Sequence, residues 1–496
     1  MEIHTSSIGE WKKSGVASCI VVAMRPGAAA SFPLIDETAT SLLESARARG
    51  AFSGKAGESM FLPLPGADVV GVLAIGLGDN TDPDAETVRR AAGKGIDNLR
   101  AHRVTRLAID CSVSWPVVPF IEGIALGQYR FERYKKPDPD AFSGEIDDVV
   151  LVCDAPDTLH DVRDACRYAE RVCRNTNWAR DLANAASNDM TPAQLALDAH
   201  GIAEKYKLGY ECLDAGRMAE LGMNALLGVA KGSKQPPKLI ILNYRAANDV
   251  PTVALVGKGI TFDTGGISIK PSDSMHEMKY DMCGAAAVLG TMRTVGRTKP
   301  NLNVLCVVPA AENCVDGNAQ KPGDIVRAYN GKTIEVHNTD AEGRLILCDA
   351  LAYTVDHYAP DMIVDVATLT GGVLVALGHY AAGVMSTDDA LCAGIEAAAN
   401  ATGERVWRFP LWDDYSKLIE GEHADLSNIG PPRQASSIIG GVFLKEFVGD
   451  TPWAHIDIAG TAWGAKNISY LDTKYASGYG VRLLSEWIRA TAGAGA

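Results

Sequence analysis

The chain has 496 residues, of which 47% are hydrophobic and 22% charged, and its 47 basic and 61 acidic side chains give a net charge of −14. This length exceeds one ordinary core and predicts two or three domains, while the acidic balance argues against general binding to nucleic acids or anionic membranes. The N-terminus lacks the apolar run of a secretory signal, and the 11 cysteines occur without a Cys-x-x-Cys pair, so we expect a cytoplasmic protein. No segment approaches about 18 consecutive apolar residues, so we expect no membrane span.

The first third of the chain alternates apolar segments of strand length with amphipathic segments of helix length. Strands are expected at residues 19–24, 69–75, 107–111 and 149–153, and helices at residues 37–49, 85–101 and 118–129. Alternation of this kind is typical of α/β layers. We therefore predict a smaller N-terminal α/β domain over residues 1–157.

A long charged segment with helical character, residues 158–186, is predicted to link this domain to the next one. Thr191 and Pro192 follow shortly after it, and this pair is a favourable N-cap and first turn for a new helix. A second domain is expected over residues 187–496.

The second domain again alternates strands and helices. Buried strands are expected at residues 239–243, 253–256, 304–308, 362–366 and 454–458, and helices at residues 285–295, 344–357, 388–401 and 436–447. Asn330 and Gly331 lie between alternating residues and predict a hairpin turn. We expect a larger α/β catalytic domain with a mixed sheet flanked by helices.

Three segments of this domain carry charged residues where apolar residues would be expected. The first begins directly after the strand at 253–256 and holds Lys258, Asp263 and Lys270 among several glycines. Charges at the end of a buried strand are costly unless they are paired or bind a metal. Glycines permit tight turns around such a site.

The other two charged segments hold Asp281, just before a run of small residues, and Asp340, Glu342 and Arg344. Asp340 and Glu342 are two residues apart, a spacing that projects both carboxylates to the same side of an extended segment. Arg344 then opens the helix expected at 344–357.

The four carboxylates would repel one another strongly if they converged in a site of low dielectric constant. They would then need cations, and hard oxygen ligands suit Mg, Mn or Zn. Two divalent ions would offset the carboxylates and leave Lys270 and Arg344 as positive groups that stabilise an oxyanion. The pattern therefore favours a two-metal hydrolase.

Residues 338–345 form the octapeptide Asn-Thr-Asp-Ala-Glu-Gly-Arg-Leu, which resembles the signature of the leucyl aminopeptidase family at all eight positions. The segment 258–270 and Asp281 resemble the family's other site segments in the same order. The resemblance implies a metal-dependent aminopeptidase that releases leucine-like residues from peptides with a free N-terminal amine by attack of a metal-bridging water. It also implies a homohexamer of two stacked trimers.

The resemblance further implies a set of metal ligands. Asp263 and Glu342 would each bridge two ions, Lys258 and Asp281 would complete one site, and Asp340 would complete the other, partly through its backbone carbonyl. The ions would be Zn or Mn, with Mg or Co as further candidates for one site. A lysine ligand must be neutral, so the ions must depress its pKa sharply.

The remaining implied residues act on the substrate. Lys270 would polarise the scissile carbonyl or stabilise the oxyanion, and Arg344 would hold a bicarbonate as general base. The substrate-binding residues that the resemblance implies are Met278, Asn338, Thr368, Leu369 and Gly371.

Several residues also have a purely structural interpretation. Any one of the seven charged residues alone would more often cap an element or lie on the surface, but seven at fixed spacing favour the metal site. Residues 257–259 lack the third glycine of a dinucleotide loop, because Phe262 stands in its place. His337 is expected to pack or to hydrogen-bond rather than to bind a metal. The basic segment 130–136 is interpreted as a solvated helix end.

Two rival functions stay open from the sequence. A DNA-binding or assembly protein with an incidental hydrolase site would have a basic surface and a degraded metal site, in contrast to the net charge of −14 and the intact residues. A carboxylate-metal hydrolase for another amide would be distinguished by its activity on N-acetylated substrates.

Overall fold

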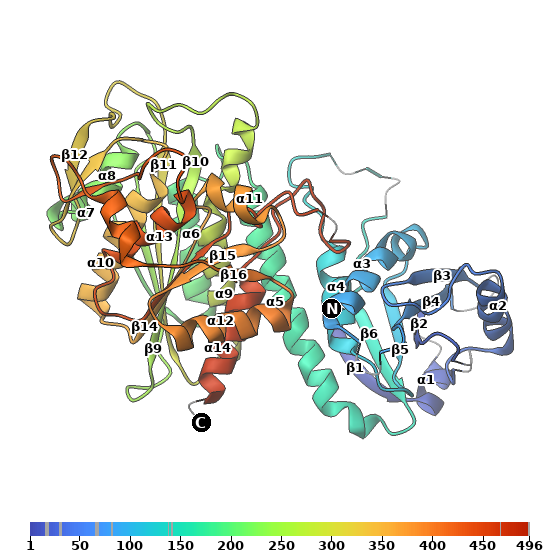
Figure 1. Ribbon diagram of the computed structural model, residues 1–496. Coiled ribbons are helices and arrows are strands. Elements are labelled where there is room, and N and C mark those ends of the chain that lie inside the picture. The colour runs from blue at the N-terminus through green and yellow to red at the C-terminus, as the bar shows by residue number, and fades with distance from the viewer. Residues whose placement is uncertain are drawn as a thin grey trace. The chain divides into compact units, whose positions relative to one another are not determined.

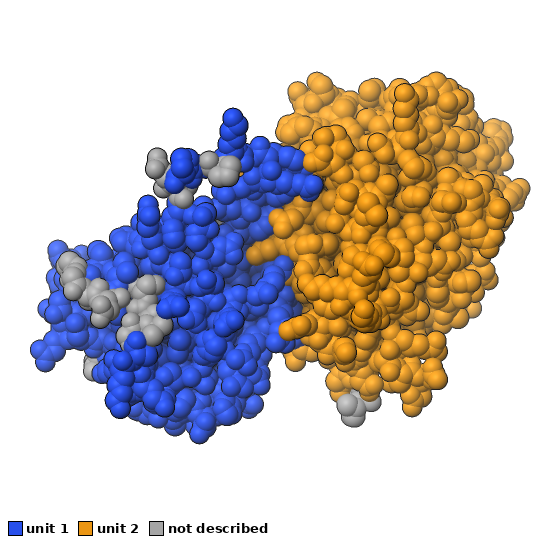
Figure 2. Space-filling view, turned by 180° about the vertical axis from the view of Figure 1, so that it is seen from behind, with its two compact units in different colours: residues 1–174, 467–472 blue, residues 175–466, 473–496 orange. Residues whose placement is uncertain are grey.

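The computed structural model describes residues 1–14, 19–28, 32–64, 69–80, 83–136, 138–139, 142–466 and 468–494. The chain divides into two compact units, unit 1 with residues 1–174 and 467–472 and unit 2 with residues 175–466 and 473–496 (Figure 2). The division falls inside helix α5 (His160–Asn184), between Arg174 and Asn175. Among the described residues, no helix is long and apolar enough to cross a membrane.

Unit 1 is built on a six-stranded sheet in the order β1-β6-β5-β2-β4-β3. Its strands are β1 (Glu2–Ser7), β2 (Cys19–Met24), β3 (Ser59–Pro63), β4 (Gly71–Gly76), β5 (Arg106–Asp110) and β6 (Asp148–Cys153). Its helices before α5 are α1 (Ile8–Ser14), α2 (Glu37–Ala48), α3 (Ala85–Ala101) and α4 (Val117–Gly127). β3 pairs antiparallel with β4, whereas the other strand pairs are parallel.

The central strands of unit 1 are apolar throughout because both faces of the sheet are covered. In β2, Val21 belongs to one buried cluster with Leu73, and Val22 belongs to another with Val72. The sequence predicts β2 and α3 with the observed bounds. It misses β1, whose sequence is mostly polar, and β3, which is a short and partly exposed edge strand.

Unit 2 is built on a nine-stranded mixed sheet in the order β16-β15-β18-β14-β9-β11-β8-β7, with β10 paired to β11. Figure 1 labels β9, β10, β11, β14, β15 and β16 of this sheet. Its strands are β7 (Gly209–Leu213), β8 (Lys238–Tyr244), β9 (Thr252–Gly257), β10 (Gly259–Asp263), β11 (Asn303–Asn313), β14 (Met362–Ala367), β15 (Ala382–Ser386), β16 (Val406–Arg408) and β18 (Trp453–Asp457). The central strands β11, β9, β14 and β18 are parallel, and β8 and β15 run antiparallel to them.

Helices cover both faces of this sheet. One buried cluster joins it to α6 (Pro192–Tyr206), α9 (Cys283–Thr298), α12 (Asp389–Thr402) and α14 (Val481–Ala494). The other joins it to α7 (Ala215–Glu220), α8 (Asn224–Ala230), α10 (Gly343–Tyr358) and α13 (Ser436–Lys445). A small sheet of β12 (Asp324–Arg327), β13 (Thr333–Val336) and β17 (Leu426–Ser427) completes the unit.

The predicted two-domain α/β fold is confirmed, and so are two of its local signals. Thr191 caps α6 by accepting a hydrogen bond from the Gln194 N–H at 3.2 Å. β12 and β13 form the predicted hairpin, with Gly331 at φ +89° in the turn. β11 is longer than predicted, since it continues past residue 308 to Asn313. This extension carries Asn313 beside the charged end of β10.

Candidate metal centre

The predicted charged residues meet at the carboxyl ends of the central strands of unit 2. Lys258 lies between β9 and β10, its N–H donates to the Val366 carbonyl of β14 at 3.0 Å, and Asp263 ends β10. Asp281 lies in the 3-10 segment η2 (Met275–Met282) just before α9, and Glu342 directly precedes α10. Open α/β sheets bind their ligands at this edge.

Two lysines lie among the four carboxylates. The ion pairs join Nζ of Lys258 to Asp281 and to Glu342, each at 2.8 Å, and Nζ of Lys270 to Asp263 at 2.7 Å and to Asp340. Asp263, Asp340 and Glu342 each offer an oxygen, and these three atoms lie within 4.8 Å of one another. Lys258, Asp263 and Glu342 are at most 3% exposed, so this charge is held almost out of water.

Burial and mutual repulsion disturb the titration of these groups. Burial raises the pKa of Asp263 to about 6, and the neighbouring Glu342 adds to the rise. Burial also raises the pKa of Asp281 well above its ordinary value. Burial also tends to raise the pKa of Glu342. The positive charges of Lys258 and Lys270 have the larger effect, so the pKa of that carboxyl is lowered. The ionised forms of Asp263 and Asp281 are thus disfavoured by burial and by neighbouring carboxylates, and further cations in the cluster would favour them.

The donor set fits divalent cations. Converging carboxylate oxygens are the hard ligands that Mg²⁺, Mn²⁺ and Zn²⁺ accept. The three convergent oxygens come from two segments, the end of β10 and the turn before α10, and such a convergence of carboxylates is costly unless cations compensate it. The residues available as ligands are Lys258, Asp263, Asp281, Asp340 and Glu342.

The segment with Asp340 and Glu342 is not extended, so that expectation was wrong. Thr339 and Asp340 lie in a turn, and Glu342 already has helical dihedral angles, φ −78° and ψ −33°. The turn is closed by Asn338, whose Oδ1 accepts a hydrogen bond from the Asp340 N–H at 2.9 Å. This turn at the start of α10, rather than a strand, brings the two carboxylates together.

Asn313 supports the cluster from the end of β11 and was missed by the sequence reasoning. Its Nδ2 donates to Oδ1 of Asp263 at 2.8 Å and to the Thr339 carbonyl at 3.1 Å. The Gly265 N–H donates to the same Asp263 oxygen at 2.9 Å. The available signal was a polar residue at the end of a long apolar run. Asn313 therefore orients a candidate metal ligand.

Asn428, which follows β17, was missed as well. Its carbonyl accepts a hydrogen bond from Nη1 of Arg344 at 2.9 Å, and its Nδ2 donates to the Asn338 carbonyl at 2.7 Å. Nothing in the local sequence marks this residue, because its role depends on a loop that returns from more than 80 positions away.

Two glycines of the site are required by close approach. A Cβ at Gly265, where φ is +85°, would lie 2.7 Å from Oδ1 of Asp340. A Cβ at Gly343 would lie 2.5 Å from Cε of Lys258. Both distances are too short for any side chain, so these positions leave room for the charged groups.

Of the five predicted substrate-binding residues, Thr368 and Asn338 contact the cluster directly. Oγ1 of Thr368 donates to Oδ1 of Asp281 at 2.7 Å, and Asn338 closes the turn beside Asp340. Leu369 follows Thr368, and its N–H donates to Asp457 at 3.1 Å. Met278 is half-buried in η2, and Gly371 is exposed at the start of α11 (Gly371–Leu377).

A set of buried polar side chains on β14 and β18 was not assigned from the sequence. Nδ1 of His455 lies 2.6 Å from Oδ1 of Asp365, and both side chains are fully buried. Nε1 of Trp453 donates to the other Asp365 oxygen at 2.7 Å. Asp457, two residues on, accepts a hydrogen bond from Oγ1 of Thr370 at 2.7 Å. Trp453, His455 and Asp457 are alternate residues of the buried strand β18, and Asp457 contacts the segment that follows β14.

His337 behaves as the sequence predicts. Its ring contacts Glu335 at 3.2 Å and Oγ of Ser427 at 3.3 Å. These contacts give it a hydrogen-bonding role away from the candidate ligands.

Comparison with known proteins adds an independent line of evidence. Residues 177–485 match the family model described as "Cytosol aminopeptidase family, catalytic domain", and residues 22–138 match the model of that family's N-terminal domain. A "Probable cytosol aminopeptidase" from Geotalea uraniireducens is 45% identical over 427 residues, which cover 84% of this chain and 85% of that protein. A protein of the same name from Desulforapulum autotrophicum is 42% identical over 463 residues, or 89% of this chain and 88% of that protein.

A solved structure matches nearly the whole chain. It is described as "Bottromycin maturation enzyme BotP in complex with Mn" and shares 31% identity with this chain at a TM-score of 0.84. The match covers 96% of this chain and 100% of that one.

Proposed function

The chain belongs to the cytosol aminopeptidase family and is an aminopeptidase, and we propose that unit 2 works with two divalent ions and prefers leucine-like N-terminal residues. The resemblance to leucyl aminopeptidases is thereby confirmed at the level of the family. The observation that carries the metal proposal is the convergence of Asp263, Asp340 and Glu342 within 4.8 Å. The solved relative described with Mn supports Mn. Zn is proposed beside it from the resemblance, with Mg or Co as further candidates for one site.

We assign five residues as ligands. Asp263 and Glu342 would serve both ions, Lys258 and Asp281 would complete one site, and Asp340 would complete the other. Lys258 can serve only as a neutral amine, because an ammonium group has no lone pair to donate. When bound, the ions supply Lewis acidity and lower the pKa of a water nucleophile.

Lys270 and Arg344 take the catalytic roles. The side chain of Lys270 is 21% exposed beside Asp263, so its ammonium can donate a hydrogen bond to the carbonyl oxygen of a substrate. Arg344 is nearly buried, and its Nε has no hydrogen-bond partner among the described residues. A guanidinium with a spare N–H suits a small oxyanion, and we assign bicarbonate to it as the general base.

The substrate side of the proposal rests on the segments around the cluster. A free α-amine would be held near the ions, which limits cleavage to the first peptide bond. The residues assigned to the substrate are Met278, Asn338, Thr368, Leu369 and Gly371. Apolar Met278 and Leu369 favour leucine-like side chains, and one methylene changes discrimination by about 1–3 kcal/mol.

Three further proposals rest on the resemblance and the sequence. They are a homohexameric assembly, a cytoplasmic location, and domain limits at residues 1–157, 158–186 and 187–496. Sedimentation velocity on the purified chain tests the first of them, since a hexamer and a monomer differ sixfold in mass.

The decisive experiment is chelation followed by metal add-back, with leucine p-nitroanilide as the reporter. Activity should disappear on chelation and return with Mn or Zn, and elemental analysis of the active protein should find two ions per chain. Activity that survives complete chelation would reject the metal proposal. Equal activity on N-acetylated leucine p-nitroanilide would reject the need for a free amine.

A further inference from the structure

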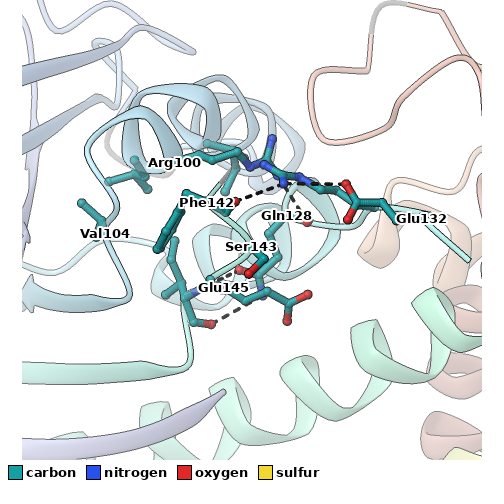
Figure 3. Close-up of a pocket in the computed structure, with 12 residues that line it drawn as sticks. Arg100, Val104, Gln128, Glu132, Phe142, Ser143 and Glu145 are labelled. Carbon is teal, nitrogen blue, oxygen red and sulfur yellow. Dashed lines mark hydrogen bonds and ion pairs between the residues drawn. The ribbon is translucent and has the colours of Figure 1, made fainter. Parts of the chain in front are cut away.

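Unit 1 contains a cavity that the proposed reaction does not use. Its volume is about 130 Å³, and it is lined by residues from the end of α3, from the segment after α4 and from the segment before β6 (Figure 3). These three segments belong to the same unit, so the cavity is formed within unit 1.

Hydrogen bonds hold the cavity open. The Gln128 Oε1 accepts a hydrogen bond from the Ile146 N–H at 2.9 Å, and Nη1 of Arg130 donates to the Phe142 carbonyl at 3.2 Å. Nη2 of Arg100 donates to the Gln128 carbonyl at 3.3 Å. The segment before β6 is therefore tied to the end of α4 by the chain's own contacts, and no ligand is needed to form the walls.

One end of the cavity is apolar. We define the apolar wall as Ile96, Leu99, Val104 and Phe142, of which the first three are at most 4% exposed. Figure 3 shows Val104 and Phe142 toward one end and Glu132 toward the other. An engineered cavity of about 150 Å³ with aliphatic and aromatic walls binds benzene, so this volume is of the size that holds a small apolar side chain.

The other end carries both signs of charge. Arg100 and Arg130 line the cavity together with Glu132 and Glu145. The ion pairs that these arginines form within the chain are long, and their acidic partners are exposed to solvent. Arg130 lies 3.9 Å from Glu132, and Arg100 lies 3.4 Å from Asp97. Burial and then repulsion by the Arg130 guanidinium lower the pKa of Arg100. Such weakly paired groups remain available for a ligand.

We propose that this cavity binds a free α-amino acid with an apolar side chain. The ligand's carboxylate pairs with Arg100 and Arg130, as guanidinium groups favour planar oxyanions. Its ammonium faces Glu132 or Glu145, and its side chain packs on the apolar wall. A fatty acid or an alkyl amine would satisfy only one sign of charge. A small peptide also carries one ammonium and one carboxylate group, and the test below distinguishes a peptide from a free amino acid.

The test is isothermal titration calorimetry on the full chain after removal of metals, which also removes the metal contacts proposed for an α-amine in unit 2. L-leucine should bind saturably at one site per chain. Leucine amide and 4-methylpentanoate, which lack one charge each, should bind at least about tenfold more weakly, because each loses a charge-assisted hydrogen bond. Tighter binding of leucyl-leucine than of leucine would overturn the free amino acid as the ligand.

Variants locate the binding. Arg100→Gln and Arg130→Gln should each weaken leucine binding at least about tenfold, whereas Arg90→Gln, on the same helix but outside the cavity, should not. Glu132→Gln provides a second variant should an arginine variant fold poorly, and it should also weaken leucine binding. An unchanged unfolding transition of unit 1 in scanning calorimetry reports that each variant is folded. Binding that is absent up to about 10 mM, or that survives both arginine changes, or that is lost in Asp263→Ala, would overturn the proposal.

Discussion

Units 1 and 2 share a construction but differ in what they place at the ends of their parallel strands. Both have a largely parallel central sheet with helices on its two faces. In unit 2, β10 ends at Asp263, which faces Lys270 and Asn313. In unit 1, β5 ends at the buried Asp110, which accepts a hydrogen bond from the Ser112 N–H at 2.9 Å. An α/β layer offers a position for a site, but only a set of converging charges makes one.

The largest expected effect comes from removing the strand-end aspartate in each unit. Asp263→Ala should release both ions and lower kcat/KM at least about 1,000-fold, because bound metals supply several kcal/mol of transition-state stabilisation. Asp110→Ala should leave activity intact and lower the free energy of unfolding by about 1–3 kcal/mol. Elemental analysis, peptidase kinetics and urea unfolding measure these effects. If Asp263→Ala still held two ions per chain, the strand-end aspartate of unit 2 would not be a metal ligand, and the proposed difference between the two units would be wrong.

A second test separates the cations of the site from its metal ligands. Lys270→Ala and Arg344→Ala should each lower kcat about 100- to 1,000-fold. This is the usual effect of losing a preorganised oxyanion donor, as proposed for Lys270, and lies within the usual effect of losing a positioned general base, as proposed for Arg344. Both variants should keep two ions per chain. Full activity on leucine p-nitroanilide in either variant would show that its residue does not have the assigned role.

The buried pair of Asp365 and His455 predicts a pH dependence of stability. Burial acts to lower the pKa of His455, but Asp365 and then Asp457 outweigh both burial and the nearby Arg344, so the pKa is raised. With a folded-state pKa above the ordinary value of about 6.5, the stability gained from the pair is fully present below that pH and is lost as pH rises through the folded-state pKa.

Asp365→Asn should therefore cost about 3–5 kcal/mol at acidic pH, the usual effect of breaking a buried ion pair. The difference from the unchanged chain should shrink as the pH rises above about 6.5. Urea unfolding followed by tryptophan fluorescence across pH 5.5–8.5 or so measures it. A difference that grows with pH would show that the pair is not ionic.

The two ends of β11 offer a smaller and sharper contrast. Asn313→Ala should weaken metal binding about 10- to 100-fold, because it removes a donor that orients Asp263. Asn303 at the other end of the strand is equally buried but bonds the backbone of Ala246 and Ala247. Asn303→Ala should lower stability without changing metal affinity, as measured by competition with a chelating dye. Equal metal affinities in the two variants would argue against an orienting role for Asn313.

The smallest expected effects are those of the helix caps. Asp36 caps α2 in unit 1 by accepting a hydrogen bond from the Ala39 N–H at 2.8 Å, and Thr191 caps α6 in unit 2. Asp36→Ala and Thr191→Ala should each cost about 1 kcal/mol. Scanning calorimetry should show the loss in the transition of the unit that carries the change, with peptidase activity retained in both. A loss of activity without a shift in unfolding would contradict this purely local role.

The sequence by itself determined the features that depend on local pattern. The continuous apolar run at β2, the Thr191 cap and the Asn330-Gly331 turn follow from side-chain burial and backbone preference over a few residues. The charged residues of unit 2 stood out for the same reason, since Lys258 and Asp263 follow directly on an apolar strand. Their family resemblance then supplied the roles.

Only the tertiary structure decided which distant groups meet. Asn313 lies 50 positions from Asp263, and Asn428 lies 84 positions from Arg344, so the local sequence does not show which residue each of them contacts. Both depend on the order of strands in the sheet and on the return of loops to its edge. The cavity of unit 1 is likewise assembled from three separate segments. Periodicity encodes which face of an element is buried, whereas proximity between elements is set by the packing of the whole unit.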